Sequence, residues 1–425
     1  MQNNNYNKYF FLFTSLNICL IPLFLITGPF LPDLSLSICS LSYFFYILLN
    51  RQLNVFRNFF FIFFIIFYIV ILISSFLSGN IQFSLHSSLP YVRFGLFVMC
   101  VWHTAQEDKN LFNKIFIVLT IIFFLLVFDG YLQFFTGTNI LNYEKMGVRV
   151  SSFFGDKLIL GSYVIRFFPI YLGMYFFLNR KKITSLYSNI FFILFLVLIS
   201  ILVIISGERT AFGLLLLSTL LMFFFLHGLK KIKIIILVFL TIANVIFISV
   251  YQSNFHRLIV ETKEQIITED KIYFFGSRRH EYAAVSINIF KENILLGSGP
   301  RTYRINSNDQ KYKISDLSWN THPHSIYFQL LAETGILGTL LVFFAFCYFV
   351  IFLFRESFNK SQNNNLSKLN SNIKICIVIS IIINFFPLIP SGNFFNNWMS
   401  VVYFYPISLF FAFTHKLNLR NKFLN

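Results

Sequence analysis

Residues 57–77 read RNFFFIFFIIFYIVILISSFL, and no charged side chain interrupts this stretch after Arg57. About 20 consecutive apolar residues are enough to cross a lipid bilayer as a helix, so the stretch predicts a membrane span. Similar stretches recur along the chain. We expect twelve spans, near residues 9–26, 30–49, 57–77, 89–103, 113–134, 158–178, 187–206, 210–227, 232–251, 336–354, 372–390 and 397–414.

The composition is that of a polytopic membrane protein. Of the 425 residues, 56% are hydrophobic and 12% are charged, whereas soluble proteins carry about 25% charged residues. The mean hydropathy is +0.70, and a soluble protein of this length has too little interior for so much apolar surface. The five cysteines all lie in apolar stretches without a CxxC pair, so we predict no structural metal and no disulfides.

The charge pattern predicts the topology. The chain has 34 Lys and Arg against 17 Asp and Glu, a formal charge of +17. In a membrane protein this excess points to topology or to an anionic lipid-linked substrate, and we predict no nucleic-acid partner. With the N-terminus inside, 18 cations fall on short cytoplasmic segments, while 13 of the outer ones lie in two longer loops. Both termini are therefore expected to be cytoplasmic.

The spans divide the chain into three parts. Residues 1–251 hold nine spans and a small outer loop at about 135–157. Residues 252–335 form one large outer loop, which is polar enough to fold outside the membrane and is where we expect the functional motifs. Residues 336–425 hold the last three spans and a cytoplasmic C-terminus.

Arginine is enriched on the predicted outer side, where 7 Arg accompany 7 Lys, against 5 Arg and 13 Lys on the cytoplasmic segments. Guanidinium groups bind phosphate and carboxylate in a bidentate manner, although counts this small also arise by chance. Arg209 opens a helix from the turn SGERTA, and helix N-termini favour anions. We expect it to bind phosphate; an interfacial anchor is the alternative.

Three further outer arginines are candidates. Arg278 and Arg279, in GSRRHE, begin a helix-like stretch. Neighbouring residues of a helix point about 100° apart, so we expect one of the two to face a site; a solvated basic patch is the alternative. Arg149 lies in GVRVSS on the smaller loop, where substrate contact and a solvated cation are equally open.

Arg93 and Arg166 lie within predicted spans, where a charged side chain costs roughly 2.5–3.5 kcal/mol. Such residues usually face the bundle interior and pair. We favour contact with the substrate path for Arg93, with the alternative that it reaches the membrane surface. For Arg166 we favour a structural pair.

The stretch THPHSIYFQLLAETGILG, residues 321–338, has a helix entry at Pro323 and glycines at 335 and 338 that suit a helix end. His324 then lies near the helix start at the membrane boundary. Histidine is readily poised as a base near neutral pH. The alternative is an interfacial histidine with a backbone partner, and we interpret His322 in that way.

Two carboxylates rival His324 as the base. They are Glu281, which is also a candidate for substrate contact, and Glu333, for which we favour a structural role at the helix end. The last outer turn, Ser391–Trp398, offers amides and aromatic faces to sugars; an aromatic belt at the membrane surface is the alternative.

The motifs SGERT (206–210), GSGP (297–300) and HS…QLLAETG (324–335) occur in this order, and they resemble the O-antigen ligase family. This family contains lipopolysaccharide O-antigen ligases and related O-antigen polymerases. The motifs cover about residues 147–340, and the layout of spans extends the likeness over the chain. The resemblance implies an all-α polytopic membrane fold of the GT-C type, with about 12 transmembrane helices and one large periplasmic loop containing short helices.

The resemblance also implies an activity. Such an enzyme, in the bacterial inner membrane, transfers a glycan from undecaprenyl diphosphate to a sugar hydroxyl on the periplasmic face, without metal, nucleotide or other cofactor. The acceptor is lipid A–core for a ligase, which we favour, or a lipid-linked glycan for a polymerase. A flippase or transporter is less favoured, because the internal repeats typical of transporters are not evident.

Carried over to this sequence, the resemblance assigns the diphosphate to Arg209 and to Arg279 or Arg278, with Arg279 favoured. It assigns His324 to orienting or deprotonating the acceptor hydroxyl. Glu208 departs from the family pattern, and a pair with Arg209 would weaken the hold on phosphate. The predicted catalytic residues are His324, Arg209 and Arg279; the further candidates for substrate contact are Arg278, Arg149, Arg93 and Glu281.

Overall fold

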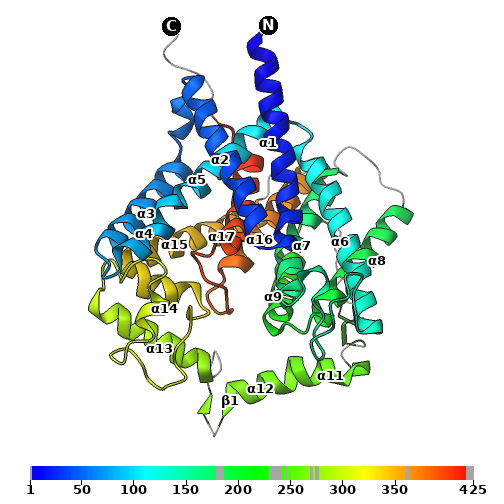
Figure 1. Cartoon of the computed structure of the whole chain (residues 1–425). Coiled ribbons are helices and arrows are strands. Elements are labelled where there is room, and N and C mark those ends of the chain that lie inside the picture. Colours follow the sequence, from blue (N-terminus) through cyan, green and yellow to red (C-terminus); the bar gives the residue numbers. More distant parts are fainter. Residues whose placement is uncertain are drawn as a thin grey trace.

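The protein is a bundle of helices (Figure 1). The computed structural model describes residues 2–178, 186–228, 241–242, 244–245, 247, 249–268, 271–272, 277–359 and 364–417. Within these residues the named strands are β1 (Ile267–Thr268) and β2 (Lys271–Ile272), which form an antiparallel hairpin. Two isolated β-bridges join residues of the loop after α6. The helical membrane class is confirmed, with these short pairings added.

Seven helices of the described residues are long and apolar enough to cross a membrane: α1 (Gln2–Thr27), α2 (Phe30–Leu49), α3 (Phe59–Phe76), α6 (Leu111–Thr136), α7 (Leu160–Leu178), α15 (Ile326–Phe358) and α16 (Asn365–Phe385). Four more helices also fall on predicted spans: α5 (Val92–Glu107), α8 (Leu186–Ile205), α9 (Arg209–Phe225) and α17 (Asn397–Thr414). The ninth predicted span, near 232–251, lies largely outside the described residues. The total of twelve spans stays a prediction.

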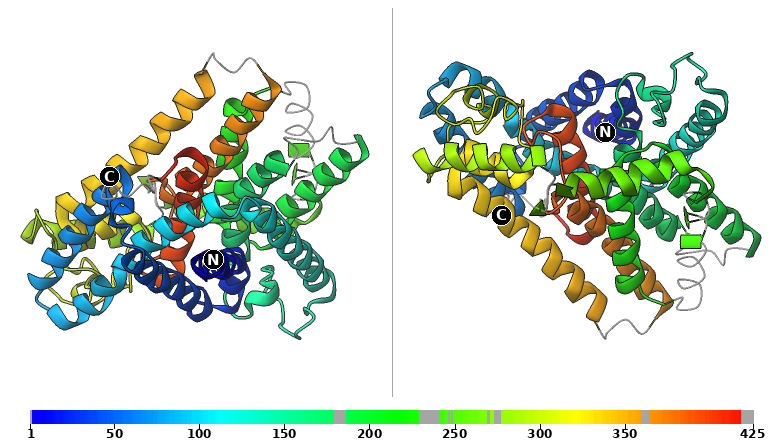
Figure 2. Two further views of the ribbon diagram at one scale, coloured as in Figure 1. Left: turned by 90° about the horizontal axis from the view of Figure 1, so that it is seen from above. Right: turned by 90° about the horizontal axis from the view of Figure 1, so that it is seen from below.

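Helices α16 and α17 form the centre of the bundle. All side chains of Ile375–Phe385 in α16 and of Trp398–Phe411 in α17 are buried. A helix that is apolar around its whole circumference is stable only when other helices surround it. Accordingly α16 packs against α7 and α15, and α17 packs against α5 and α16. Figure 2 shows α17, in red, in the middle of the bundle from above and from below.

Short helices gather at the end of the bundle opposite the N-terminus (Figure 1). They are α11 (Gln252–Phe255), the π-helical turn η4 (His256–Val260), α12 (Glu261–Ile266), α13 (Ser277–Glu292) and α14 (Tyr303–Asn306). We call this the loop end. All of these helices belong to the segment predicted as a large outer loop. Helix α17 starts near the loop end, where the indole nitrogen of Trp398 donates to the carbonyl of Leu25 at 2.9 Å.

Helix α15 is interrupted at Gly335, whose backbone angles (φ 63°, ψ −162°) are accessible essentially to glycine alone. A Cβ atom on Gly335 would lie 2.4 Å from the carbonyl carbon of Leu295. Beside it, the amide of Ile336 donates to the carbonyl of Ile294 at 2.8 Å. The predicted helix end is therefore wrong. The apolar sequence after Gly335 resumes the helix, the glycine makes a kink, and Gly338 lies inside α15.

Candidate active site

The turn between α8 and α9 places Arg209 at the loop end. Gly207 takes a positive φ of 64°, and a Cβ there would lie 3.0 Å from Cγ of Arg149 and 3.5 Å from Cδ of Arg257. Arg257, from η4, donates through Nε to the carbonyl of Gly207 at 2.9 Å. Arg149 donates to the carbonyl of Leu158 at 2.9 Å. Three arginines from separate segments therefore surround one turn.

The carboxylate that faces Arg209 is not Glu208 but Glu261. Glu261 lies 3.9 Å from Nη1 of Arg209 and 3.2 Å from Nη1 of Arg257. Arg209 Nη1 is buried and has no hydrogen-bond partner within the described part of the chain. Glu261 is thus shared by two arginines, Arg209 and Arg257, and the arginines around this turn keep an excess of positive charge.

Glu208 instead caps helix α7. Its Oε1 accepts from the amides of Gly161 and Ser162 at 2.7 and 3.3 Å, and its Oε2 accepts from the Ser162 hydroxyl at 2.5 Å. Negative charge is favoured at a helix N-terminus, where amides are unpaired. The pair between Glu208 and Arg209 that the sequence left open does not form, because α7 supplies three donors to the carboxylate. Glu208 acts on the cluster through its neighbour Arg149, whose pKa is lowered chiefly by burial while Glu208 opposes this.

The structure separates the two adjacent arginines of α13. Arg278 is exposed, whereas Arg279 is partly buried. Burial lowers the pKa of Arg279, and repulsion from Arg209 adds to the effect. Arg279 also influences His324. Of the two, Arg279 is therefore the one with electrostatic neighbours in both the Arg209 turn and His324, and its part in binding stays a prediction.

His324 precedes α15 in a left-handed backbone conformation with φ 56°. Its carbonyl accepts from the amide of Ser391 at 2.9 Å, and its Nε2 lies 3.3 Å from Nδ2 of Asn320. The ring of Tyr282 is 6.0 Å away between centroids. Burial lowers the pKa of His324 to about 4, with a smaller contribution from Arg279. The imidazole is therefore neutral at pH 7 and has a lone pair for a proton.

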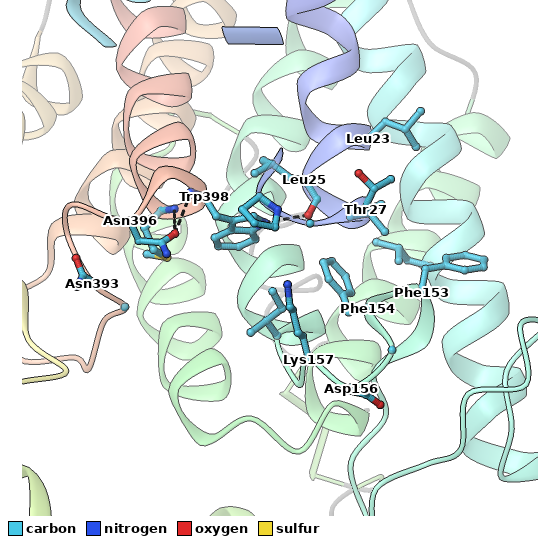
Figure 3. A pocket seen from close by; sticks show the side chains of 18 of the residues that line it. Leu23, Leu25, Thr27, Phe153, Phe154, Asp156, Lys157, Asn393, Asn396 and Trp398 are labelled. Atoms are coloured by element: carbon cyan, nitrogen blue, oxygen red, sulfur yellow. Dashed lines mark hydrogen bonds between the residues drawn. The ribbon is translucent and has the colours of Figure 1, made fainter. Parts of the chain in front are cut away.

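A cavity of about 940 Å³ lies next to this histidine. His322 lines it and contacts His324, with ring centroids 4.1 Å apart and the ring planes tilted by 53°. Arg301 and Arg304 contribute to the same wall. Figure 3 shows part of the lining, where the Lys157 side chain points inward below Trp398. We interpreted His322 from the sequence as an ordinary interfacial residue, whereas it belongs to a cavity wall.

The two rival carboxylates have other partners. Glu333 is fully buried; its Oε1 accepts from the amide of Tyr303 at 3.0 Å and its Oε2 accepts from Gln329 at 2.9 Å. It ties α14 to α15 beneath the site. Glu281 accepts from the Ser315 hydroxyl at 2.6 Å. Both carboxylates are therefore engaged by other parts of the protein.

The two arginines of the spans are held within the bundle. Arg93, on α5, forms an ion pair with Asp33 of α2 at 2.8 Å, and Asn397 donates to the same carboxylate at 3.0 Å. Arg93 therefore takes part in a link between three helices, and the substrate contact expected for it stays a prediction. Arg166 is buried in α7 and donates to the carbonyl of Ser162 at 2.9 Å.

Sequence reasoning did not select Arg257, Arg301 or Arg304. Their neighbours are distant in sequence. Arg257 of η4 contacts the Arg209 turn only in the folded protein, and Arg301 and Arg304 line a cavity together with His322. The enrichment of arginine on the predicted outer side was the available signal, and it included all three. Among the described residues, no group of three or more His, Cys, Asp or Glu side chains is arranged to bind a metal ion.

A comparison with protein families gives one match. Residues 194–343 match the family model described as O-antigen ligase. The matched region runs from α8 into α15 and contains Arg209, Arg257, Arg279 and His324. The resemblance found in the motifs is thereby confirmed for this region. The chain matches no curated protein sequence.

Proposed function

We propose that the protein is a glycosyltransferase that moves a glycan from undecaprenyl diphosphate to a sugar hydroxyl. The observation that carries this proposal is the order of three side chains from separate elements. Arg209, Arg279 and His324 follow one another at the loop end, each influencing the next electrostatically. This order suits a reaction in which an anionic leaving group and a hydroxyl nucleophile meet at one sugar carbon.

The arginines bind the diphosphate of the donor. When the bond between the sugar carbon and the diphosphate oxygen breaks, that oxygen gains negative charge. Fixed guanidinium groups in a partly desolvated site stabilise this charge more than mobile water does. Arg209 offers a buried Nη1 with no hydrogen-bond partner in the described residues, and Arg279 approaches from α13. Arg257 and Arg149 support the turn and add positive charge.

His324 serves the acceptor. A neutral imidazole nitrogen accepts the hydroxyl proton while the acceptor oxygen forms its bond to the sugar carbon, and undecaprenyl diphosphate departs. The positive charge that the reaction needs comes from the chain's own arginines, so the proposal invokes neither metal nor nucleotide. Transfer to lipid A–core makes the protein a ligase, and transfer to a lipid-linked glycan makes it a polymerase.

We propose that the loop end faces the periplasm and that both termini are cytoplasmic, in the bacterial inner membrane. The distribution of cations supports this orientation, because short connections at the opposite end carry most of the lysines. On this reading residues 1–251, 252–335 and 336–425 are the first transmembrane part, the periplasmic part and the last transmembrane part.

The test uses a strain that lacks its own O-antigen ligase. The strain is complemented with wild type, Arg209→Ala, Arg279→Ala or His324→Ala, and core-linked and lipid-linked glycans are separated on gels. Wild type should restore core-linked glycan or lengthen the lipid-linked chains, and the three variants should abolish this at equal membrane levels. Lys291→Ala is the matched control, because Lys291 is an exposed cation on the same helix as Arg279.

The two products distinguish the two members of the family. Core-linked glycan supports the ligase, and longer lipid-linked chains support the polymerase. Full activity of His324→Ala would remove the base from the proposal. Full activity of both arginine variants would contradict the donor site.

A further inference from the structure

The cavity of about 940 Å³ has a cationic wall that the donor site does not use. Arg301, Arg304 and Lys157 line it, and none of the three forms an ion pair within 4.0 Å with a carboxylate of the described residues. Arg301 donates through Nη1 to the Ser87 hydroxyl at 3.3 Å, which leaves its other donors for a ligand. Asp156 also lies at the cavity, but Figure 3 shows its carboxylate pointing away while Lys157 points inward. The lining therefore carries a net positive charge.

Two polar atoms in this wall have unused hydrogen-bonding capacity. Nε of Arg304 and Nε2 of His322 are buried and have no hydrogen-bond partner in the described part of the chain. Buried donors and acceptors are normally paired, with protein or with another molecule. An oxygen-rich ligand in the cavity would provide such partners.

The other side of the cavity is apolar and belongs to membrane-crossing helices. Leu23 of α1 and Ile122 and Leu126 of α6 line it. Both helices are long and apolar enough to span a bilayer. The cavity therefore combines an anion-binding wall with a wall suited to a lipid chain, which is the chemistry of a phosphorylated glycolipid.

His324 has neighbours in both groups. Among the donor arginines, Arg279 influences it electrostatically. In the cavity lining, His322 is 4.1 Å from His324 between ring centroids, and Arg304 in turn influences His322. A base that deprotonates a hydroxyl must contact the acceptor while the donor carbon lies within about 3–3.5 Å of the attacking oxygen. An acceptor that reaches His324 from the side of His322 meets this requirement.

We propose that the cavity is the acceptor site, in which Arg301 and Arg304 bind a phosphate group of a lipid-anchored glycan whose hydroxyl is presented to His324. This inference rests on the proposed function and specifies its second substrate. A phosphate on lipid A–core and the diphosphate of a second undecaprenyl-linked glycan have the same chemistry for these arginines. The protein thus holds two phosphorylated lipids, one on each side of a histidine.

The experiment measures binding to the full-length protein in nanodiscs. The probes are undecaprenyl diphosphate without sugar, rough-type lipopolysaccharide (lipid A with core), and the same lipopolysaccharide after chemical removal of its phosphates. The variants are Arg304→Gln for the acceptor site and Arg209→Ala for the donor site. Lys311→Gln is the control, since Lys311 lies on the same segment but pairs with Glu292, away from the cavity lining.

A ligase should bind rough-type lipopolysaccharide, and Arg304→Gln should weaken this about tenfold, as expected for a lost charge-assisted hydrogen bond. Removing the phosphates should weaken binding to wild type by a similar factor and abolish the effect of the variant. A polymerase should instead bind two undecaprenyl diphosphates per chain, and Arg304→Gln should bind one. Arg209→Ala should lose the donor and keep the acceptor in either case.

Three results would overturn the inference. The first is unchanged lipopolysaccharide affinity and unchanged undecaprenyl diphosphate stoichiometry in Arg304→Gln. The second is a wild type with only one undecaprenyl diphosphate site, which Arg304→Gln and Arg209→Ala each abolish; this would assign the cavity to the donor. The third is wild type that binds neither lipopolysaccharide nor a second undecaprenyl diphosphate. Donor binding that does not depend on Arg209 contradicts the proposed function itself, whatever Arg304 does.

Discussion

The protonation of His324 should set the pH dependence of the reaction. Its pKa of about 4 lies below the ordinary value of 6.5, because burial disfavours the imidazolium and Arg279 repels it. We therefore expect kcat/KM of the reconstituted protein to stay level from about pH 8 to about pH 5 and to fall toward pH 4. A fall centred near pH 6.5 would contradict this assignment.

Two measurements test the causes of this shift. Arg279→Gln removes a positive neighbour, so the acid limb of its residual activity should move to higher pH. The stability of the folded protein should also depend on the protonation of His324. Between about pH 6.5 and about pH 4 the unfolded chain binds this proton and the folded chain does not, so His324 lowers the free energy of unfolding as the pH falls through this interval. His324→Gln should weaken the loss of thermal stability over this interval.

The cap that Glu208 places on α7 predicts a stability effect. Glu208→Ala leaves the amides of Gly161 and Ser162 without their acceptor and removes a charge at the helix start, which should cost about 2 kcal/mol. Ser162→Ala removes the hydroxyl donor alone and should cost about 1 kcal/mol. Melting temperatures in nanodiscs check the ranking. Equal melting temperatures for wild type and Glu208→Ala would show that the cap does not hold α7.

Single residues differ in how far sequence could predict them. The angle between neighbours on a helix predicted only that one of Arg278 and Arg279 faces a site, and the preference for Arg279 came from the resemblance to the family. Glu208 beside Arg209 in the chain suggested a pair, but a helix nearly fifty residues away in sequence supplies better donors. Arg93 likewise forms its ion pair with Asp33 of another helix. Partners of this kind depend on tertiary packing, which apolar stretches of similar composition do not reveal.

At the scale of elements, the kink in α15 holds the site together. Gly335→Ala would force a Cβ into the carbonyl of Leu295 and into a backbone region that alanine avoids, so it should cost about 3 kcal/mol or more. Gly213→Ala in α9 is the matched control, because a Cβ there meets nothing within 4 Å and alanine favours a helix. Membrane level and melting temperature should fall in the first variant and hold in the second. Unchanged behaviour of Gly335→Ala would contradict the described kink.

The elements themselves were largely predictable. Runs of apolar residues indicated helices whose bounds in the structure match closely, as with residues 30–49 and 397–414. The sequence around Gly335 does not distinguish a helix end from a kink, because glycine occurs at both. What distinguishes them is the segment near residue 295 lying against it, a contact that is remote in sequence.

At the scale of the whole molecule, the proposed orientation predicts which residues a membrane-impermeant thiol reagent reaches. Gln310 is exposed at the loop end and Asn365 is exposed at the start of α16. Four of the five native cysteines are buried, so the background should be low. In spheroplasts Gln310→Cys should react and Asn365→Cys should react only after lysis. The reverse pattern would invert the orientation.

The burial of α16 and α17 has a consequence for how the protein is made. These two helices leave the ribosome after the helices that surround them, yet they fill the middle of the bundle. The earlier helices must therefore enter the membrane without their final neighbours and remain apart, with lipid or the insertion machinery against surfaces that later become interior. The bundle can therefore be completed only after translation has passed residue 414. A ribosome that stalls before this point leaves inserted helices without the two helices that fill the centre of the bundle.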